Sequence, residues 1–209
     1  MAENVASMAA QVLGEIQRVF NSGENGVENS ASNLVKEIAQ SKEGKIVLHG
    51  VGREGLMMRA FTMRLYHLGL NAHCLGDMTC PPVGEGDLFI ASAGPGSFSS
   101  IDALITTAKD AGARVAVVTA QPGGKAPSLA HRRIYLPAQT MADDEVAKGS
   151  DQSQTADVHD KQCEQEQILP MGSVYEGAMF ILFEIAVFLL RRELGETLES
   201  MRARHTNLE

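Results

Sequence analysis

The amino-acid sequence predicts an α/β fold built on a parallel sheet of five strands. Short apolar runs alternate along the chain with segments in which apolar residues recur every three or four positions, which is the periodicity of helices. The clearest runs are apolar at every position, as in strands covered on both faces of a sheet. A glycine-rich turn follows two of these runs, and open α/β sheets bind ligands at that end of their strands. We therefore expect a covered parallel sheet with a ligand site at its carboxyl edge.

Composition and charge exclude several classes of protein. The 209 residues are 44% hydrophobic and 21% charged, which fits one globular domain with a sizeable core. The formal net charge of -8, without a basic cluster, argues against nucleic acid or an anionic membrane surface as a partner. The longest apolar run, at 178–190, contains Glu184 and is too short to span a bilayer. The first residues lack the cationic region of a secretory signal, and three cysteines without a CxxC pair fit reduced thiols, so we expect a cytoplasmic protein.

Two helices precede the first strand. Residues 1–20 predict an amphipathic helix with one apolar stripe, and residues 21–29 are a cluster of turn-forming residues. A second helix follows and ends near Gln40. Both helices are expected to pack on the sheet or on another subunit. The stripe of the first helix consists of Val5, Met8, Val12, Ile16 and Val19.

The segment 45–69 is the part around which the rest is organised. An apolar run at 46–48 leads into a glycine turn at 50–55, and residues 57–68 then carry apolar side chains on one helical face. Strand, turn and helix in this order form the first half of a βαβ unit. Bare backbone N–H groups and the positive end of the helix dipole meet at the turn, which suits an anion or an oxygen-rich ligand.

The remaining strands are expected at 71–75, 88–92, 114–119 and 134–136. A second glycine turn at 92–97 leads into a helix at 98–111, which Gly112 ends as its cap. A turn at 121–125 and a short helix then lead to the last strand.

The chain changes character at 139–167, where eight acidic residues stand against two lysines and large apolar side chains are almost absent. We interpret this segment as an inserted polar surface loop, either a mobile lid or, as is more common, a solvated spacer. A final helix at 172–194 is apolar around its middle turns. This pattern predicts burial on all sides and, in a domain this small, a place in an oligomer interface. A short charged tail ends the chain.

Arg53 and Glu176 are the first candidates for chemistry. Arg53, beside the first glycine turn, suits a phosphate or a carbonyl oxygen, although a plain surface arginine is equally frequent. Glu176 suits a general base, although Ser173-x-x-Glu176 fits a capping box more readily. His67 near a helix end and His205 in a polar tail need no function. No spacing of His and Cys residues indicates a metal site.

The spacing Gly50-x-Gly52-x-x-Gly55 also matches the dinucleotide fingerprint, with Asp77 near the position of its ribose-binding acid. The second glycine turn competes with this interpretation, and no further domain remains to carry the chemistry of a dehydrogenase. A nicotinamide cofactor is therefore not expected.

Taken together, the motifs resemble those of the SIS (sugar isomerase) domain family, and within it the 6-phospho-3-hexuloisomerases. The resemblance covers nearly the whole chain apart from 139–167, and the terminal motif is its most specific part. The matching motifs are Gly50-x-Gly52-Arg53-x-Gly55, Met63-Arg64-Leu65-x-His67-x-Gly69, Gly86-Asp87-Leu88, Gly94-x-Gly96, Gly112-Ala113, Pro170-Met171-Gly172-Ser173, Glu176 and Arg204-His205-x-Asn207-Leu208.

The resemblance implies one SIS domain over 1–209, a flavodoxin-like sheet in a three-layer α/β/α sandwich, and a homo-oligomer, dimer or tetramer, with active sites at subunit interfaces. It implies a sugar phosphate as the ligand and no metal or nucleotide cofactor. The implied reaction interconverts 3-hexulose 6-phosphate and fructose 6-phosphate through an enediol, moving the carbonyl between C3 and C2. That reaction is the second step of formaldehyde fixation by the ribulose monophosphate route.

By the same resemblance, Glu176 is the expected base. His205 is its expected partner, reaching in from a neighbouring subunit, and His67 is a less favoured candidate. Arg53 is expected to hold oxygen atoms of the substrate. The full set of expected substrate-binding residues is Gly50, Gly52, Arg53, Thr79, Ser92, Gly94, Gly96 and Ser97.

The sequence departs from the family at the two glycine turns. Glu54 stands where the family usually has serine, and Pro95 and Phe98 stand where the second turn usually has hydroxyl residues. A carboxylate pointing inward would repel a phosphate by about a few kcal/mol, and Pro95 removes a backbone donor. Two alternatives therefore stay open, namely an isomerase for another sugar, phosphorylated or not, and a non-catalytic SIS protein that binds a sugar phosphate.

Overall fold

The structure is a computed structural model that describes residues 4–21, 26–140 and 168–208. Apart from Gln139 and Thr140, the polar segment expected at 139–167 lies outside the described residues.

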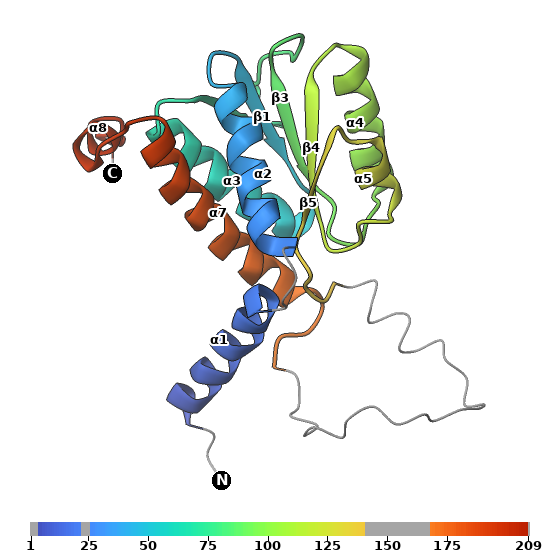
Figure 1. Cartoon of the computed structure of the whole chain (residues 1–209), viewed down its shortest axis with the longest axis vertical. Coiled ribbons are helices and arrows are strands. Elements are labelled where there is room, and N and C mark those ends of the chain that lie inside the picture. The colour runs from blue at the N-terminus through green and yellow to red at the C-terminus, as the bar shows by residue number, and fades with distance from the viewer. Residues whose placement is uncertain (1–3, 22–25, 141–167, 209) are drawn as a thin grey trace.

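Five parallel strands form one sheet in the order β2-β1-β3-β4-β5, which is the flavodoxin-like order (Figure 1). The central strand, β3, is buried at every position, as its continuous apolar run predicts. The predicted five-stranded parallel sheet is therefore confirmed. The strands are β1 (Lys45–His49), β2 (Asn71–Cys74), β3 (Leu88–Ser92), β4 (Arg114–Thr119) and β5 (Arg132–Tyr135).

Helices cover both faces of the sheet and give the predicted three layers (Figure 1). Successive strand residues point to opposite faces. Ile46 and Leu48 thus join the larger core under α2, α3 and α7, whereas Val47 joins a smaller core under α4 and α5. The covering helices are α2 (Gly26–Gln40), α3 (Gly52–His67) and α7 (Ser173–Glu193) on one face, and α4 (Ser99–Asp110) and α5 (Lys125–Leu129) on the other.

The first helix, α1 (Val5–Asn21), extends beyond the sheet beside the start of α7 (Figure 1). Ile16 packs so closely on α7 that a Cβ atom at Gly177 would lie 2.7 Å from its Cδ1 atom. Val19 is buried, whereas Val5 at the start of α1 and Leu13 at its middle are exposed. Among the described residues, the apolar stripe expected on this helix is thus fully buried only near its carboxyl end, at Val19.

Several element boundaries differ from the sequence expectation. The turn cluster is shorter than expected, because α2 already begins at Gly26. The glycine turn after β1 is also shorter, because α3 begins at Gly52 and takes Arg53 and Glu54 into its first turn. The charged tail contains a short helix, α8 (Leu198–Ala203), which Thr197 caps.

Helix α7 is not buried on all sides within one chain. The whole helix, which is longer than the apolar run at 178–190, has the length and apolarity of a membrane-spanning helix. Half of the apolar window is buried inside the domain, however, which is typical of a core helix. The opposite face leaves large apolar side chains exposed. They are Phe180, Ile181, Ile185 and Phe188.

Candidate active site

The turn after β1 is tight because glycine stands on both sides of it. A Cβ atom at Gly55 would lie 2.5 Å from the carbonyl oxygen of Gly50, so only glycine lets α3 begin this close to the strand. Gly52 has a φ of 59°, in the left-handed region that glycine adopts without strain. The helix start thereby points Arg53 and Glu54 toward the elements that follow β3 and precede α7.

Glu54 bonds to the second glycine turn. Its Oε2 atom accepts hydrogen bonds from the Ser92 hydroxyl at 2.5 Å and from the backbone N–H of Gly94 at 3.1 Å. A Cβ atom at Gly94 would lie 2.8 Å from Tyr175 Cε1 and 2.9 Å from Glu54 Oε1. Glycine at this position is thus required for the turn, the carboxylate and the α7 tyrosine to meet.

Arg53 bonds to the segment that leads into α7. Its guanidinium donates to the carbonyl oxygen of Met171 and, at 2.9 Å, to the hydroxyl of Ser173. Met171 has a φ of 58°, in the left-handed region, which residues other than glycine adopt only at a cost in free energy. The guanidinium and the strained segment together position the first turn of α7.

Glu176 forms an ion pair with Arg53, with 3.1 Å between Oε2 and Nη2. The same Oε2 atom is buried and accepts no hydrogen bond from the described residues. The sequence favoured a capping box of Ser173 and Glu176, and this prediction is wrong. Gly172, not Ser173, is the N-cap of α7, and there is no side-chain hydrogen bond at this cap. Ser173 lies inside the helix and donates its hydroxyl to the carbonyl oxygen of Pro170 instead.

These side chains line one cavity of about 360 Å³. It contains one arginine and two carboxylates, and the other side chains of its wall are largely apolar. The lining residues are Val51, Gly52, Arg53, Glu54, Pro95, Phe98, Thr140, Met171, Gly172, Tyr175 and Glu176.

The environment shifts the titration of three of these groups. Burial raises the pKa of Glu54, and hydrogen bonds from Ser92 and Gly94 only partly oppose it. Burial also raises the pKa of Glu176; the charge of Arg53 lowers it and the charge of Glu54 raises it further. Tyr175 is fully buried, which holds the pKa of its phenol well above the usual range. Carboxyl groups whose pKa values are raised in this way are typical of proton-transfer sites.

The other expected binding residues are not side chains of the cavity. Ser92 is completely buried beneath Glu54. Ser97 donates its hydroxyl to Asp102, and Thr79 is exposed in the loop after β2. Gly96 uses its N–H on the carbonyl oxygen of Ala93, within its own turn. Gly50 supports the turn after β1 through the close packing described above.

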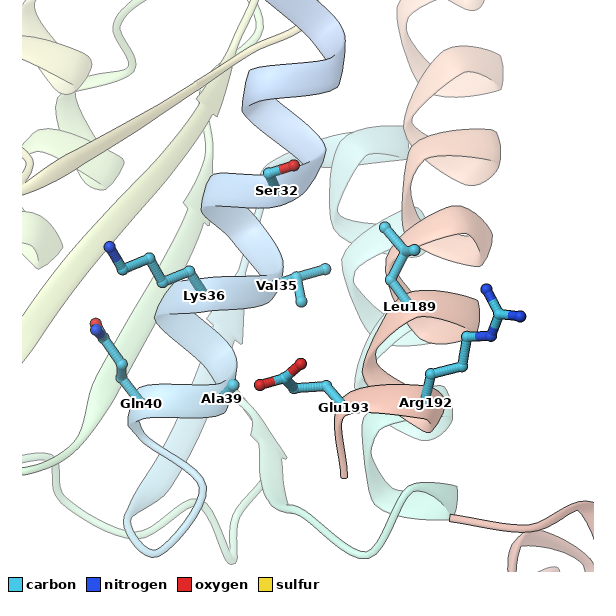
Figure 2. A pocket seen from close by; sticks show the side chains of 8 residues that line it. All are labelled: Ser32, Val35, Lys36, Ala39, Gln40, Leu189, Arg192 and Glu193. Atoms are coloured by element: carbon cyan, nitrogen blue, oxygen red, sulfur yellow. The ribbon is translucent and has the colours of Figure 1, made fainter. Parts of the chain in front are cut away.

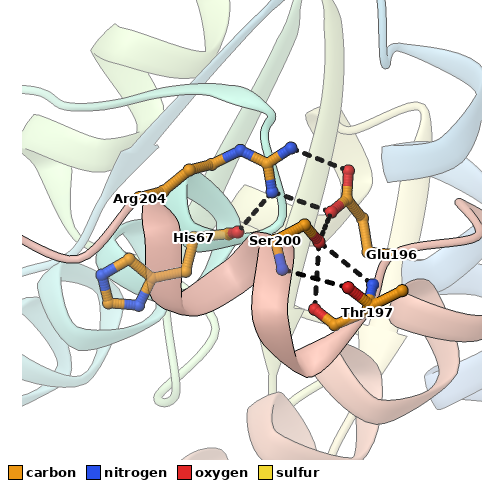
Figure 3. A network of polar contacts seen from close by, with 5 residues as sticks. All are labelled: His67, Glu196, Thr197, Ser200 and Arg204. Carbon is orange, nitrogen blue, oxygen red and sulfur yellow. Dashed lines mark hydrogen bonds and ion pairs between the residues drawn. The ribbon is translucent and has the colours of Figure 1, made fainter.

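The two candidate histidines lie at the far end of α3. Arg53 and His67 are at opposite ends of this helix, about 20 Å apart at 1.5 Å per residue. The rings of His67 and His205 lie 5.3 Å from each other. Arg204 holds them there, because its guanidinium bonds to Glu196 and to the carbonyl oxygen of His67 (Figure 3). Within one chain, neither histidine reaches the cavity.

A larger groove of about 710 Å³ lies between α2 and α7, and Figure 2 shows its lining side chains. Leu189, on its wall, is thirteen residues from Glu176 along α7, which is about 20 Å. The groove is therefore separate from the cavity at the sheet edge. Nowhere in the described residues do three His, Cys, Asp or Glu side chains gather as metal ligands would.

Tyr175 was not among the residues predicted from the sequence, and Glu54 was expected only as a departure from the family. The position of Tyr175 beside Glu176, at the start of an apolar helix, was the available signal. Without the fold, nothing in the sequence indicates that its ring meets a glycine of a turn 81 residues earlier.

Solved structures of low sequence identity share this fold. A protein of Methanococcus jannaschii, whose crystal structure infers a function of 3-hexulose-6-phosphate isomerase, superposes with a TM-score of 0.75 at 23% identity. The match covers 97% of this chain and 99% of that one. A Vibrio vulnificus protein complexed with ManNAc-6P gives a TM-score of 0.68 at 17% identity, covering 97% of this chain and 67% of that one.

Sequence similarity narrows the class to one family. The 3-hexulose-6-phosphate isomerase of Bacillus subtilis is 31% identical over 200 residues, which are 96% of each chain. No protein-family model matches the chain. At this identity and coverage, the chain belongs to the 3-hexulose-6-phosphate isomerase family.

Proposed function

We propose that the cavity isomerises a ketose by moving its carbonyl between C3 and C2, as between 3-hexulose 6-phosphate and fructose 6-phosphate. The observation that carries the proposal is the partly buried Glu176 carboxylate in the cavity. Its Oε2 atom is buried, accepts no hydrogen bond from the described residues, and lies 3.1 Å from Arg53. A base beside a fixed cation is what an enediol reaction needs. The names of the sequence relatives support the same reaction.

In the proposed reaction, Glu176 is the base and Arg53 is the electrostatic stabiliser. Glu176 removes the C2 proton of the 3-ketose, and the electron pair of that bond forms an enediolate whose negative oxygen is O3. Arg53 stabilises this oxygen electrostatically. The O2 proton then moves to O3, and Glu176 returns its proton to C3, which leaves the carbonyl at C2. In the reverse direction the same base removes the C3 proton of the 2-ketose.

The reverse step gives a direct test. Wild-type protein is incubated in deuterated water with fructose 6-phosphate and, separately, with fructose, and the C3 proton signal is followed by NMR. We expect the C3 signal of at least one ligand to disappear while its C4 signal persists, because C3 is next to the carbonyl and C4 is not. Retention of the C3 proton in both ligands would contradict an isomerase.

We further propose that the protein acts as a homo-oligomer in the cytoplasm. The exposed apolar face of α7 favours a second copy as its cover, since a patch of large apolar side chains marks an interaction surface. A neighbouring subunit is also needed if His205 is to serve a cavity that its own chain does not let it reach. Sedimentation velocity at micromolar concentration is expected to show a dimer or larger species. A monomer would argue against the homo-oligomer and against a role for His205 from a neighbouring subunit.

A further inference from the structure

The Glu54 carboxylate stands at the second glycine turn, between the carboxyl end of β3 and the start of α4, where parallel sheets bind phosphate groups. The N–H of Gly94 and the hydroxyl of Ser92 donate hydrogen bonds to it. We propose that Glu54 is a substrate-binding residue that takes up a proton when a sugar phosphate binds and then donates a hydrogen bond to the phosphate. The proposal rests on the isomerase function and deepens it by assigning the contact with the phosphate.

The two oxygen atoms of Glu54 have different surroundings. Both hydrogen bonds that the described residues donate to this carboxylate end on Oε2. Oε1 receives none from them, is not closed off from solvent, and belongs to a residue that lines the cavity. Oε1 is therefore the oxygen that can carry a proton and direct it toward a ligand. A protonated carboxyl group is a hydrogen-bond donor, which an ionised one is not.

A phosphate dianion in contact with Glu54 favours the protonated form of this carboxyl group. Two acidic groups at hydrogen-bond distance share a proton, because the charge of one raises the pKa of the other. Burial already raises the pKa of Glu54 in the empty cavity. Pro95 and Phe98 give the same cavity apolar walls, and an apolar surrounding strengthens the interaction between charges. The proton comes from solvent and is bound on Oε1.

The groups around Glu54 determine which carboxylate takes the proton. Ser92 faces Glu54 from β3, and Tyr175 and Glu176 face it from α7. Arg53, the one cation among the lining residues of the described cavity, pairs with Glu176 and lowers its pKa, whereas no cation of the described residues pairs with Glu54. The Tyr175 phenol stays neutral, because burial holds its pKa well above the usual range. The proton therefore goes to Glu54, and Glu176 remains ionised as the base.

Calorimetry measures the proton uptake directly. Wild-type protein is titrated with fructose 6-phosphate at about pH 7.5 in buffers of different ionisation enthalpy, and with fructose as the uncharged control. The free phosphate is then largely a dianion, since its second pKa is about 6. We expect about one proton to be taken up for each 6-phosphate bound and none for fructose. The Kd of the 6-phosphate should accordingly rise by up to about tenfold per pH unit above neutral pH.

Glu54→Gln imitates the protonated acid, because its amide N–H donates a hydrogen bond without taking up a proton. This variant is expected to bind fructose 6-phosphate without proton uptake, and about tenfold more tightly than wild type at about pH 8, where wild type must first be protonated. Glu184→Gln is the matched control. Glu184 pairs with Arg64 and does not line the cavity, so its replacement should leave the proton uptake unchanged.

The proposal is overturned if wild type does not bind fructose 6-phosphate or binds it without proton uptake. It is also overturned if Glu54→Gln takes up as many protons as wild type, because the phosphate or another group would then carry the proton. The wild-type titration still tests the uptake where a variant does not fold. Because binding is measured without turnover, failure of the isomerase proposal would show as retained C3 protons, whereas failure of the Glu54 proposal would show in the proton count.

Discussion

Glu176→Gln is expected to slow C3 proton exchange about 10³-fold, which corresponds to about 4 kcal/mol in the barrier. The amide has nearly the shape of the carboxylate but cannot accept the proton. Arg53 keeps its hydrogen bonds to Met171 and Ser173, so the cavity is expected to keep its form. Exchange rates at C3, measured by NMR at several ligand concentrations, separate this loss in turnover from a loss in binding.

Glu184→Gln is the matched control for this substitution. Glu184 lies about two turns further along α7, pairs with Arg64, and does not line the cavity. Its replacement changes the same charge on the same helix and is expected to leave the exchange rate within about twofold, since an exposed ion pair contributes little. Equal losses in the two variants would show that Glu176 acts through the helix rather than as the base.

The assignment of Glu176 also sets the direction of the pH dependence. A base must be ionised, so activity falls as pH falls through its pKa. Burial and the charge of Glu54 raise this pKa above the usual value of 4.5, against the opposing effect of Arg53. The acid limb of the pH–rate profile is therefore expected above pH 4.5, and Glu54→Gln should move it to lower pH. A limb that stays in place in this variant would contradict direct coupling of the two carboxylates.

The sheet could be predicted because its buried strands consist mostly of apolar residues. The central runs at 88–92 and 114–119 are apolar at successive positions, and the structure places β3 and β4 at these residues. The residues at which helices begin were harder to predict from the sequence than the strands. The start of α3 at Gly52 depends on the close approach of Gly50 and Gly55, which is a contact in space that no periodicity reports.

Only some residues of the candidate site could be predicted from the sequence, and their arrangement could not. Arg53 and Glu176 were both candidates, yet they are 123 positions apart and local rules assigned Glu176 to a helix cap. The capping box does not form in the structure. The guanidinium of Arg53, on α3, donates a hydrogen bond to the hydroxyl of Ser173 at the start of α7. Glu54 shows the same limit, since its bond to Gly94 joins two turns that only the parallel sheet brings together. Tertiary hydrogen bonds override local signals where a site is built from several loops.

Gly55→Ala is expected to lower the free energy of unfolding by about 3 kcal/mol. The added Cβ atom would lie 2.5 Å from the carbonyl oxygen of Gly50, and both groups belong to the backbone, so the start of α3 must move away from β1. That movement displaces Arg53 and Glu54 together. The fraction of protein that still folds should therefore also bind fructose and fructose 6-phosphate more weakly.

Gly14→Ala is the control for this last effect, because it adds the same methyl group inside α1 with no atom within 4 Å. It is expected to raise the free energy of unfolding by about 0.5–1 kcal/mol, since alanine favours a helix over glycine. Urea unfolding of both variants gives the two midpoints, and an unchanged m value shows that the midpoint reports stability. If Gly55→Ala were as stable as Gly14→Ala, the turn would have room for a side chain, and the close contact that positions the cavity's arginine and Glu54 would not exist in solution.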